Sequence, residues 1–310
     1  MNDDDPTAAE IDKLAVRRAF EKAAKTYHDT ASLQRHIAHE LIEQLDYMAI
    51  APRRILDVGA GTGFCTIALA ERFPSAEIVA VDLAEAMLHE TRARLCPSGI
   101  AKWMPGKHRQ STRRFVCADA EQLPLADASV DLIVSSLAFQ WCNNLSAALR
   151  ECRRVLTPQG LLLFSSLGPD SLRELRQAFS KVTNSAHVSR FLDLHDVGSL
   201  MVDAGLSGPV LSRDEIVEHY DSFRAALQSV RGIGASNALQ SRNKALTGKA
   251  LMRAAAEAYE HEAANGDYPL TYEIVYAHAW CPTQSTRPQD GSTVAQFSFE
   301  ALKNTLPRDS

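Results

Sequence analysis

Long apolar runs are missing from this chain of 310 residues. A membrane-spanning helix needs about 18 or more consecutive apolar residues, and no such uncharged stretch occurs, so we expect neither a membrane span nor a membrane partner. The first ten residues, MNDDDPTAAE, are acidic and polar, unlike the basic and apolar regions of a signal peptide or the acid-poor start of a mitochondrial presequence. We therefore predict a cytoplasmic protein.

Cysteine pairs and an excess of positive charge are also absent. None of the six cysteines belongs to a Cys-x-x-Cys pair. Cys65, Cys117 and Cys142 stand among apolar or small residues, which predicts buried free thiols in a reducing compartment. The net charge of −5 argues against a general nucleic-acid-binding protein. His36 and His39 have the spacing of metal ligands on a helix, but no third ligand is evident, so we expect no metal site.

Short strands and longer amphipathic helices alternate along most of the chain. Apolar residues at helical spacing predict helix over residues 11–47. The expected strands are 54–58, 77–82, 114–118, 130–135, 161–166 and 268–281, and the expected helices are 63–72, 84–95, 145–156 and about 221–262. This alternation predicts an α/β fold with a mostly parallel sheet covered on both faces.

The same pattern divides the chain into three parts. We expect residues 1–50 to form a helical cap over the active site and residues 51–281 to form the sheet-containing domain, with a helical insertion at about 221–265. Residues 282–310 are predicted to be a polar, mobile tail. A segment at 97–114 holds five Lys or Arg, one His and no acid. It is either a solvated loop or a contact for an acidic partner.

Three glycines at alternate positions follow the first expected strand, in the motif DVGAGTG that starts at Asp57. The dinucleotide fingerprint GxGxxG places its third glycine one position later, and the Lys-Ser/Thr of a phosphate-binding P-loop is missing. A glycine turn between strand and helix still lets a ligand approach the backbone closely. An acid two positions before the first glycine would repel a phosphate and suits an ammonium group.

Two more carboxylates end the next two expected strands. Asp82 ends the second strand, where a carboxylate can accept both hydroxyls of a ribose. Asp119 ends the third strand, where an adenine amino group would lie. A ligand with a cation, a ribose and an adenine but no required phosphate is S-adenosylmethionine, which we predict as the cofactor. The alternative is a nucleotide-sugar or NAD Rossmann domain.

These motifs, together with the stretch DAEQLPLADASVDLIVSS, resemble the class I methyltransferases over about residues 53–166. The resemblance implies a Rossmann-like, mostly parallel seven-stranded sheet with an antiparallel last strand, plus N-terminal helices and a helical lid insertion. It places the glycine loop at the methionine part of the cofactor, one carboxylate at the ribose and the other residues around the adenine and sulfonium. The implied cofactor-binding residues are Asp57, Gly59, Gly61, Gly63, Asp82, Leu83, Met87, Asp119, Ala120 and Ser136.

Motifs outside the sheet resemble the malonyl-[acyl-carrier protein] O-methyltransferase family of biotin synthesis over about residues 18–280. They are FEKAAKTYHDTASLQR, LAFQWCNNLSAALRECRRVLTPQGLLLFSSLGPDSLRELRQAF, HVSRFLDL and LQSVRGIGASN. The chain departs from the family pattern at TPQG and in its long basic loop. The resemblance implies transfer of a methyl group from S-adenosylmethionine to the free carboxylate of a malonyl thioester. A carboxylate is ionised at pH 7, so no general base is required.

The acceptor must be held by a cation and shielded from water. Arg190 is the expected cation, because a guanidinium can fork onto a carboxylate, and Tyr27 is expected to close over the cofactor and hydrogen-bond the carboxylate. Further expected acceptor contacts are Gln140, Trp141, His187 and Arg231. A surface ion pair for Arg190, and core positions for Tyr27 and Trp141, remain open.

Four basic residues cluster at helical spacing near Tyr27, namely Arg17, Arg18, Lys22 and Lys25. Carrier proteins are acidic, so this cluster either steers such a partner or is a solvated helix face. Two other functions stay open: a small-molecule carboxyl methyltransferase of the trans-aconitate type, and a protein-directed methyltransferase or assembly factor of the complex I type. The segments HVSRFL and RGIGA argue against the first, and the segment FEKAAKTY argues against the second.

Overall fold

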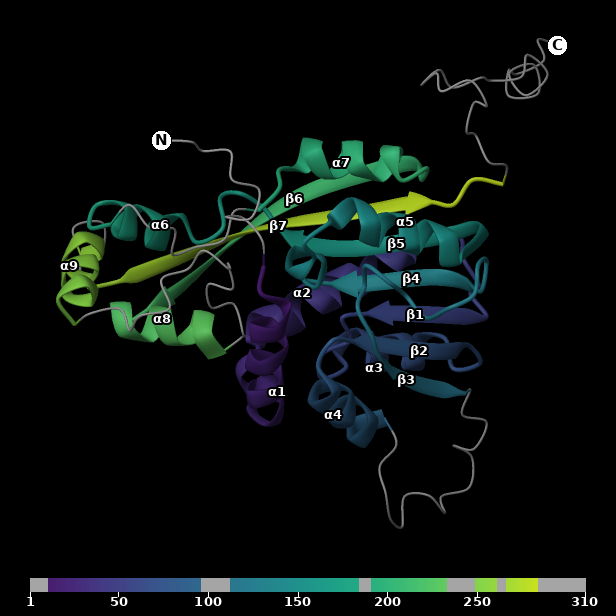
Figure 1. The fold of residues 1–310 in the computed structure, drawn as a ribbon, viewed down its shortest axis with the longest axis horizontal. Helices are drawn as coiled ribbons and strands as arrows, with labels where there is room; N and C mark the ends of the chain where they lie inside the picture. The colour runs from purple at the N-terminus through teal and green to yellow at the C-terminus, as the bar shows by residue number, and fades with distance from the viewer. Residues whose placement is uncertain (1–10, 96–111, 184–190, 233–248, 261–265, 284–310) are drawn as a thin grey trace, which may run out of the picture.

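The computed structural model describes residues 11–95, 112–183, 191–232, 249–260 and 266–283. Its centre is a seven-stranded sheet in the order β3-β2-β1-β4-β5-β7-β6 (Figure 1). The strands are β1 Arg54–Val58, β2 Glu77–Asp82, β3 Arg113–Cys117, β4 Val130–Ser136, β5 Leu156–Leu167, β6 Ser207–Tyr220 and β7 Tyr268–Trp280. Strand β7 runs antiparallel to both of its neighbours, β5 and β6, whereas the other neighbouring pairs are parallel. The predicted parallel sheet with an antiparallel last strand is confirmed.

Helices cover both faces of this sheet. They are α1 Lys13–Thr30, α2 Ser32–Glu43, α3 Phe64–Arg72, α4 Glu85–Leu95, α5 Leu145–Val155, α6 Arg173–Ser180, α7 Leu194–Asp203, α8 Phe223–Gly232 and α9 Lys249–Glu260, with short 3-10 turns η1 Gln44–Tyr47 and η3 Phe139–Trp141. Alternate strand residues point to opposite sides, so Ile55 packs with α2 and α3 while Leu56 packs with α5. None of the helices in these described ranges is long and apolar enough to cross a membrane.

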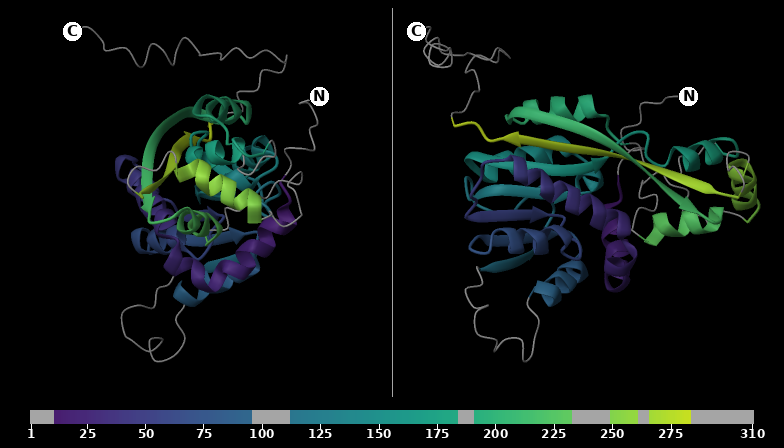
Figure 2. Two further views of the ribbon diagram at one scale, coloured as in Figure 1. Left: turned by 90° about the vertical axis from the view of Figure 1, so that its left-hand side faces the viewer. Right: turned by 180° about the vertical axis from the view of Figure 1, so that it is seen from behind.

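The predicted helix over 11–47 is divided in the structure. It begins at Lys13, where the side chain of Asp12 caps the first turn by accepting from the Ala15 N–H at 3.0 Å. The helix is interrupted at Ala31, and α2 then continues to Glu43. The interruption lets α1 turn away from the sheet face that α2 covers, so that α1 lies beside the ends of the strands (Figures 1 and 2).

Strands β6 and β7 form a long antiparallel pair that reaches beyond the rest of the sheet (Figure 2). Its far half carries α6, α8 and α9, and Phe223 and Tyr259 from two of these helices pack together at 5.5 Å between ring centroids. Helices α8 and α9 lie in the predicted insertion. Loop 97–111 and tail 284–310 lie outside the described residues.

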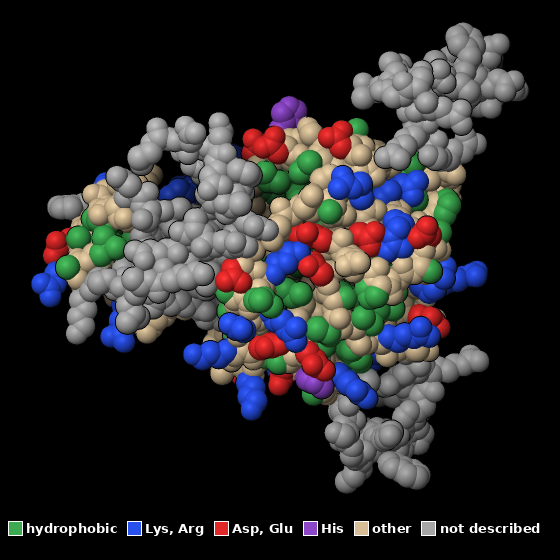
Figure 3. All heavy atoms as spheres, viewed as in Figure 1, with side chains coloured by type: hydrophobic (Ala, Val, Ile, Leu, Met, Phe, Trp, Pro, Cys, Tyr) green, Lys and Arg blue, Asp and Glu red, His purple; other side chains and the backbone are tan. Residues whose placement is uncertain are grey.

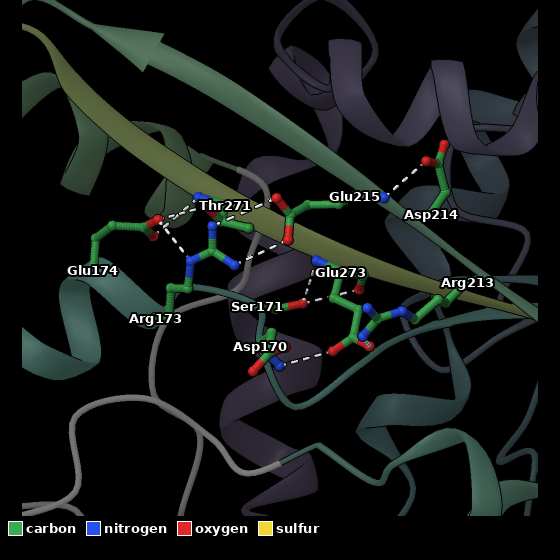
Figure 4. A network of polar contacts seen from close by, with 9 residues as sticks. All are labelled: Asp170, Ser171, Arg173, Glu174, Arg213, Asp214, Glu215, Thr271 and Glu273. Atoms are coloured by element: carbon green, nitrogen blue, oxygen red, sulfur yellow. Dashed lines mark hydrogen bonds and ion pairs between the residues drawn. The ribbon is translucent and has the colours of Figure 1, made fainter.

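A polar network fixes α6, and the residues just before it, to strand β7 (Figure 4). The carboxylate of Glu174 accepts from both the N–H and the hydroxyl of Thr271. The Ser171 hydroxyl donates to the Glu273 carbonyl at 2.9 Å and accepts from the Glu273 N–H at 3.0 Å. Glu273 is buried, and its carboxylate accepts from the Asp170 N–H at 2.8 Å. The network therefore joins α6 and the connection between β5 and α6 to strand β7.

Candidate active site

A cavity of about 100 Å³ lies between α1 and the carboxyl ends of the parallel strands. Most of the residues predicted to bind the cofactor line it, namely Gly59, Gly61, Asp82, Leu83, Met87, Asp119, Ala120 and Ser136. Tyr27 and Trp141, predicted to contact the acceptor, also belong to the lining, whereas Asp57, Gly63 and Gln140 do not. The topology therefore brings motifs that are far apart in the sequence to one place.

The three glycines after β1 have left-handed backbones, with φ of 73°, 55° and 95° at Gly59, Gly61 and Gly63, a conformation that costs other residues energy. A Cβ on Gly59 would lie 2.1 Å from the Cβ of Ala138. A Cβ on Gly63 would lie 2.8 Å from Thr91 Cγ2, whereas one on Gly61 would meet nothing within 4 Å. Close packing thus explains the first and third glycines, and the second leaves its backbone open to the cavity.

Asp57 is a buried carboxyl group behind the glycine loop. Its Oδ2 accepts from the Thr66 hydroxyl at 2.5 Å, and its Oδ1 has no hydrogen-bond partner among the described residues. Burial raises the pKa of Asp57 to about 7, the Thr66 hydrogen bond opposes this rise, and the nearby Asp82 carboxylate adds to it. A positive charge in front of this loop would stabilise the ionised form.

Asp82 is fixed by backbone groups on both sides. Its Oδ2 accepts from the Gly61 N–H and its Oδ1 from the Ala84 N–H, both at 2.8 Å. Burial raises the pKa of Asp82, and these backbone hydrogen bonds partly offset the rise. A carboxylate oxygen has two lone pairs, so each oxygen keeps one acceptor position for a ligand hydroxyl.

Aromatic side chains from α1 and η3 close the cavity beside the strands. The Phe20 ring meets the edges of Trp141 and Tyr27, with centroids 5.6 Å and 6.1 Å apart. Tyr27 is buried, and burial raises the pKa of its hydroxyl, with the Asp82 carboxylate adding to the rise. Tyr27 is therefore a neutral phenol that can donate a hydrogen bond. Gln140 points away to β5, where its Oε1 accepts from the Leu167 N–H at 3.3 Å.

Comparison with known proteins agrees with this geometry. The family model for a methyltransferase domain matches residues 56–164. A malonyl-[acyl-carrier protein] O-methyltransferase of Gallionella capsiferriformans (strain ES-2) is 41% identical over 290 residues, which is 94% of this chain and 98% of the relative. The enzyme of that name from Nitrosospira multiformis is 42% identical and covers 89% of this chain and 91% of its own. The chain belongs to the malonyl-[acyl-carrier protein] O-methyltransferase family.

Solved structures share the fold of this family member. The YcgJ protein of Bacillus subtilis matches with a TM-score of 0.52 at 20% identity, over 80% of this chain and 98% of that protein. A crystal structure from Bacillus halodurans C-125 matches with a TM-score of 0.53 at 21% identity, over 79% and 100% of the two chains. The predicted class I methyltransferase fold and S-adenosylmethionine as cofactor are both confirmed.

The cavity fits this cofactor by the chemistry of its donors and acceptors. The unpartnered oxygen of Asp57 lies buried behind the loop, Asp82 keeps two acceptor positions, and Gly61 leaves open backbone. Ser136 lies at the end of β4 and accepts from the Ser165 hydroxyl at 3.3 Å. Next to it, Leu137 has a left-handed backbone with φ of 51°. Of the described non-glycine residues with a left-handed backbone, Leu137 is the one that lines this cavity, and such strain can mark a functional site.

Three lining residues on α1 were not predicted from the sequence, and these are Lys13, Val16 and Phe20. The Lys13 Nζ lies 2.6 Å from Asp119 Oδ2 and 2.7 Å from Glu121 Oε1. A sequence signal for them exists, because positions 13, 16, 20 and 27 share one face of a helix. The family motif FEKAAKTY includes Phe20 and Tyr27 of these positions, but neither Lys13 nor Val16.

Several predicted acceptor residues cannot be placed. Arg190 and His187 lie in segment 184–190, outside the described residues. The backbone of Arg231 belongs to α8, and its side chain is not described. Among the described residues, His39 does lie with Glu40 and Glu43 in a group that could hold a metal ion. All three are exposed, and exposed groups of this kind are common without an ion, so we assign no metal there.

Proposed function

We propose that the protein transfers a methyl group from S-adenosylmethionine to the free carboxylate of malonyl-[acyl-carrier protein]. The product would be the malonyl methyl ester that primes pimeloyl chain synthesis for biotin. The observation that carries the proposal is a cavity in which the cofactor motifs meet Tyr27 and Trp141, in a chain about 41% identical to relatives named for this reaction. No observation favours a trans-aconitate or complex I type of function.

Charge neutralisation is the chemical basis of the proposed reaction. When bound, S-adenosylmethionine supplies an electrophilic methyl group on a positive sulfonium. The malonyl carboxylate, with a pKa near 4 in water, is already ionised, so the chain needs no base. Opposite charges cancel as the transfer proceeds, and a dry cavity favours such a step over one that creates charge. In-line positioning can contribute roughly 7–11 kcal/mol.

The described residues supply positioning and exclude water. Asp82 would accept the ribose hydroxyls, and Asp119 the adenine amino group. The neutral Tyr27 would donate to one acceptor oxygen and leave the other free to react. Phe20 and Trp141 would form the wall that keeps water out. We further propose that Arg190 selects the carboxylate, with His187 and Arg231 near the acceptor.

The outer face of α1 is the proposed docking surface for an acidic carrier protein. Arg18, Lys22 and Lys25 are exposed there, and Leu14 is 65% exposed beside them. Arg17 differs, because its Nε pairs with Glu21 Oε1 at 2.8 Å. Figure 3 shows Lys and Arg side chains in this region, with Asp and Glu side chains among them and further Lys and Arg across the rest of the face. Because the inner face of α1 lines the cavity, a carrier docked outside would hold its thioester close to the site.

The free thiols favour a reducing location. The five cysteines of the described residues are free thiols. Cys65 is buried as predicted and Cys142 is half-buried, but Cys117 is exposed, so the predicted burial is wrong for Cys117. Disulfides are rare in the cytosol. We propose that the protein works in the cytoplasm, where acyl carrier proteins supply the acceptor.

A methyl-transfer assay tests the proposed function. Purified protein is incubated with methyl-labelled S-adenosylmethionine and either malonyl-carrier protein or acetyl-carrier protein. We expect base-labile label, characteristic of a methyl ester, on the malonyl form only. Arg190→Ala and Tyr27→Phe should lower the rate. Cofactor binding without any transfer to the malonyl form would contradict the proposal.

A further inference from the structure

Lys13 joins the first turn of α1 to the adenine end of the cavity. Its ammonium group lies between two carboxylates, 2.6 Å from Asp119 and 2.7 Å from Glu121. Glu121 is held in turn, because its Oε1 accepts from the N–H groups of Asn143 and Asn144 at 2.6 Å and 3.2 Å. One cation on α1 therefore contacts the carboxylate proposed to receive the adenine and a carboxylate fixed to the start of α5.

A second polar contact lies beside the first. The Ile11 N–H donates to Asn143 Oδ1 at 2.6 Å, and the Asn143 side-chain NH₂ donates to the Ile11 carbonyl at 3.1 Å. The edge contact between Phe20 and Trp141 follows further along the helix. Along its first two turns, α1 is therefore joined to the segment that follows η3.

Apolar burial holds α1 weakly in comparison. The helix buries three side chains, Val16, Ala24 and Tyr27, of which one is only an alanine. The next helix, α2, buries Leu33, Ile37, Leu41 and Ile42 among others. Since burial of apolar side chains is the main force that holds a helix to the body of a protein, α1 loses less than α2 when it leaves. The polar contacts of its first residues add to this limited apolar burial.

Helix α1 forms one wall of the cavity. A cofactor bound at the glycine loop, Asp82 and Asp119 would therefore lie beneath this helix. Lys13, Val16, Phe20 and Tyr27 form the α1 wall of the cavity. Movement of α1 is the simplest way to open the cavity, because most of the other lining residues lie at or directly after the ends of strands in the central sheet.

We propose that Lys13 is a positioning residue that holds α1 closed over the cofactor, so that its ion pairs with Asp119 and Glu121 must open for cofactor entry and product release. The inference rests on the proposed function, because it takes the adenine to lie at Asp119. It follows that a carrier protein docked on the outer face of α1 hinders exchange, and that the cofactor binds before the carrier.

The charge of Lys13 suits this role. Burial lowers the pKa of Lys13, but the hydrogen bonds and charges of Asp119 and Glu121 outweigh that effect and raise it. The ammonium group is therefore charged at any physiological pH. Its side chain is 22% exposed, so water can reach the pair when it opens.

Stopped-flow fluorescence tests the inference, with S-adenosylmethionine and S-adenosylhomocysteine as probes and Trp141 as a reporter in the cavity wall. We expect Lys13→Met to raise both the association and the dissociation rate constants about tenfold, as loss of about 1.4 kcal/mol from the opening barrier requires. The equilibrium constant should change much less. Lys13→Arg should restore slow exchange, because it keeps the cation.

Glu21→Gln is the matched control, since it removes an ion pair from α1 away from the cavity and should leave both rates unchanged. Faster dissociation without faster association would indicate mere loss of structure and would overturn the inference, as would unchanged rates. If Lys13→Met does not fold, Lys13→Gln takes its place. No probe binding to the wild-type protein would overturn the proposed function and the inference with it.

Discussion

At the scale of single residues, Asp57 is buried and one of its carboxylate oxygens has no hydrogen-bond partner among the described residues. Its side chain is 1% exposed, and only one of its oxygens accepts a hydrogen bond from a described residue. Burial raises its pKa to about 7, compared with a usual value near 4. The folded chain therefore binds this proton more strongly than the unfolded chain does.

This difference predicts a pH-dependent stability. Below about pH 4 the contribution of the protonated Asp57 is fully present, and it is lost as the pH rises through about 7. The free energy of unfolding should fall by roughly 2–4 kcal/mol over this range on account of this group. Asp57→Asn should remove most of that fall, as measured by urea denaturation at pH 5 and pH 8. A remaining slope is expected from Asp82, and equal slopes in both proteins would contradict the prediction.

Much of the cofactor site was predictable at this scale, because its residues directly follow strands. The carboxyl ends of parallel strands meet at one edge, so Asp82, Asp119 and Ser136 are brought together by topology alone. Lys13 could not be assigned in this way, since its partner Asp119 lies 106 positions away. Its role depends on the angle between α1 and α2, which no local motif specifies.

At the scale of elements, the buried network around Ser171 decides where α6 lies. Its hydroxyl makes two hydrogen bonds to the backbone of Glu273, and a Cβ on Gly168 would lie 2.5 Å from the same glutamate. Helix α6 directly precedes segment 184–190, which contains the expected acceptor cation. The network therefore fixes α6, the helix that precedes that segment in the chain.

Ser171→Ala should therefore weaken acceptor binding more than cofactor binding. The Glu273 carbonyl still accepts from the Gly168 N–H at 2.9 Å, but the buried Glu273 N–H loses the Ser171 hydroxyl as its partner, at a cost of about 1–3 kcal/mol in unfolding free energy. We expect a severalfold higher KM for malonyl-carrier protein and an unchanged Kd for S-adenosylhomocysteine. The control is Ser180→Ala, whose exposed hydroxyl bonds only within α6. A parallel loss of cofactor affinity would contradict this assignment.

Elements of this outer region were the hardest to predict. Strand β6 is an edge strand whose residues are mostly exposed, so its sequence SGPVLSRDEIVEHY lacks the regular apolar alternation by which strands are found. Helices α6 and α7 are short, with eight and ten residues. By contrast β5 was predicted, but at 161–166. In the structure the strand begins at Leu156, because the residues TPQG belong to it.

At the scale of the whole molecule, charge is unevenly distributed. The chain has a net charge of −5, yet α1 presents Arg18, Lys22 and Lys25 to solvent. An acidic partner would be repelled by the molecule as a whole and attracted by this face. The negative charge of the molecule and the basic face of α1 together orient the carrier protein as it approaches.

Reversing two of these charges should impair the carrier substrate selectively. We expect Lys22→Glu with Lys25→Glu to raise the KM for malonyl-carrier protein about tenfold at low salt, with less effect at high salt. The KM for S-adenosylmethionine should not change. Arg150→Glu on α5 adds negative charge on an exposed site elsewhere and serves as the control. An equal effect of that control would show that net charge alone matters.

The short distance between Gly59 and Ala138 has a consequence for how the sequence can change. A Cβ at position 59 would lie 2.1 Å from the Ala138 side chain, so the turn after β1 packs directly against the turn after β4. Gly59 therefore cannot be replaced by a larger residue while Ala138 stays in place. Directed evolution that introduces a side chain at position 59 must therefore change Ala138 in the same variant.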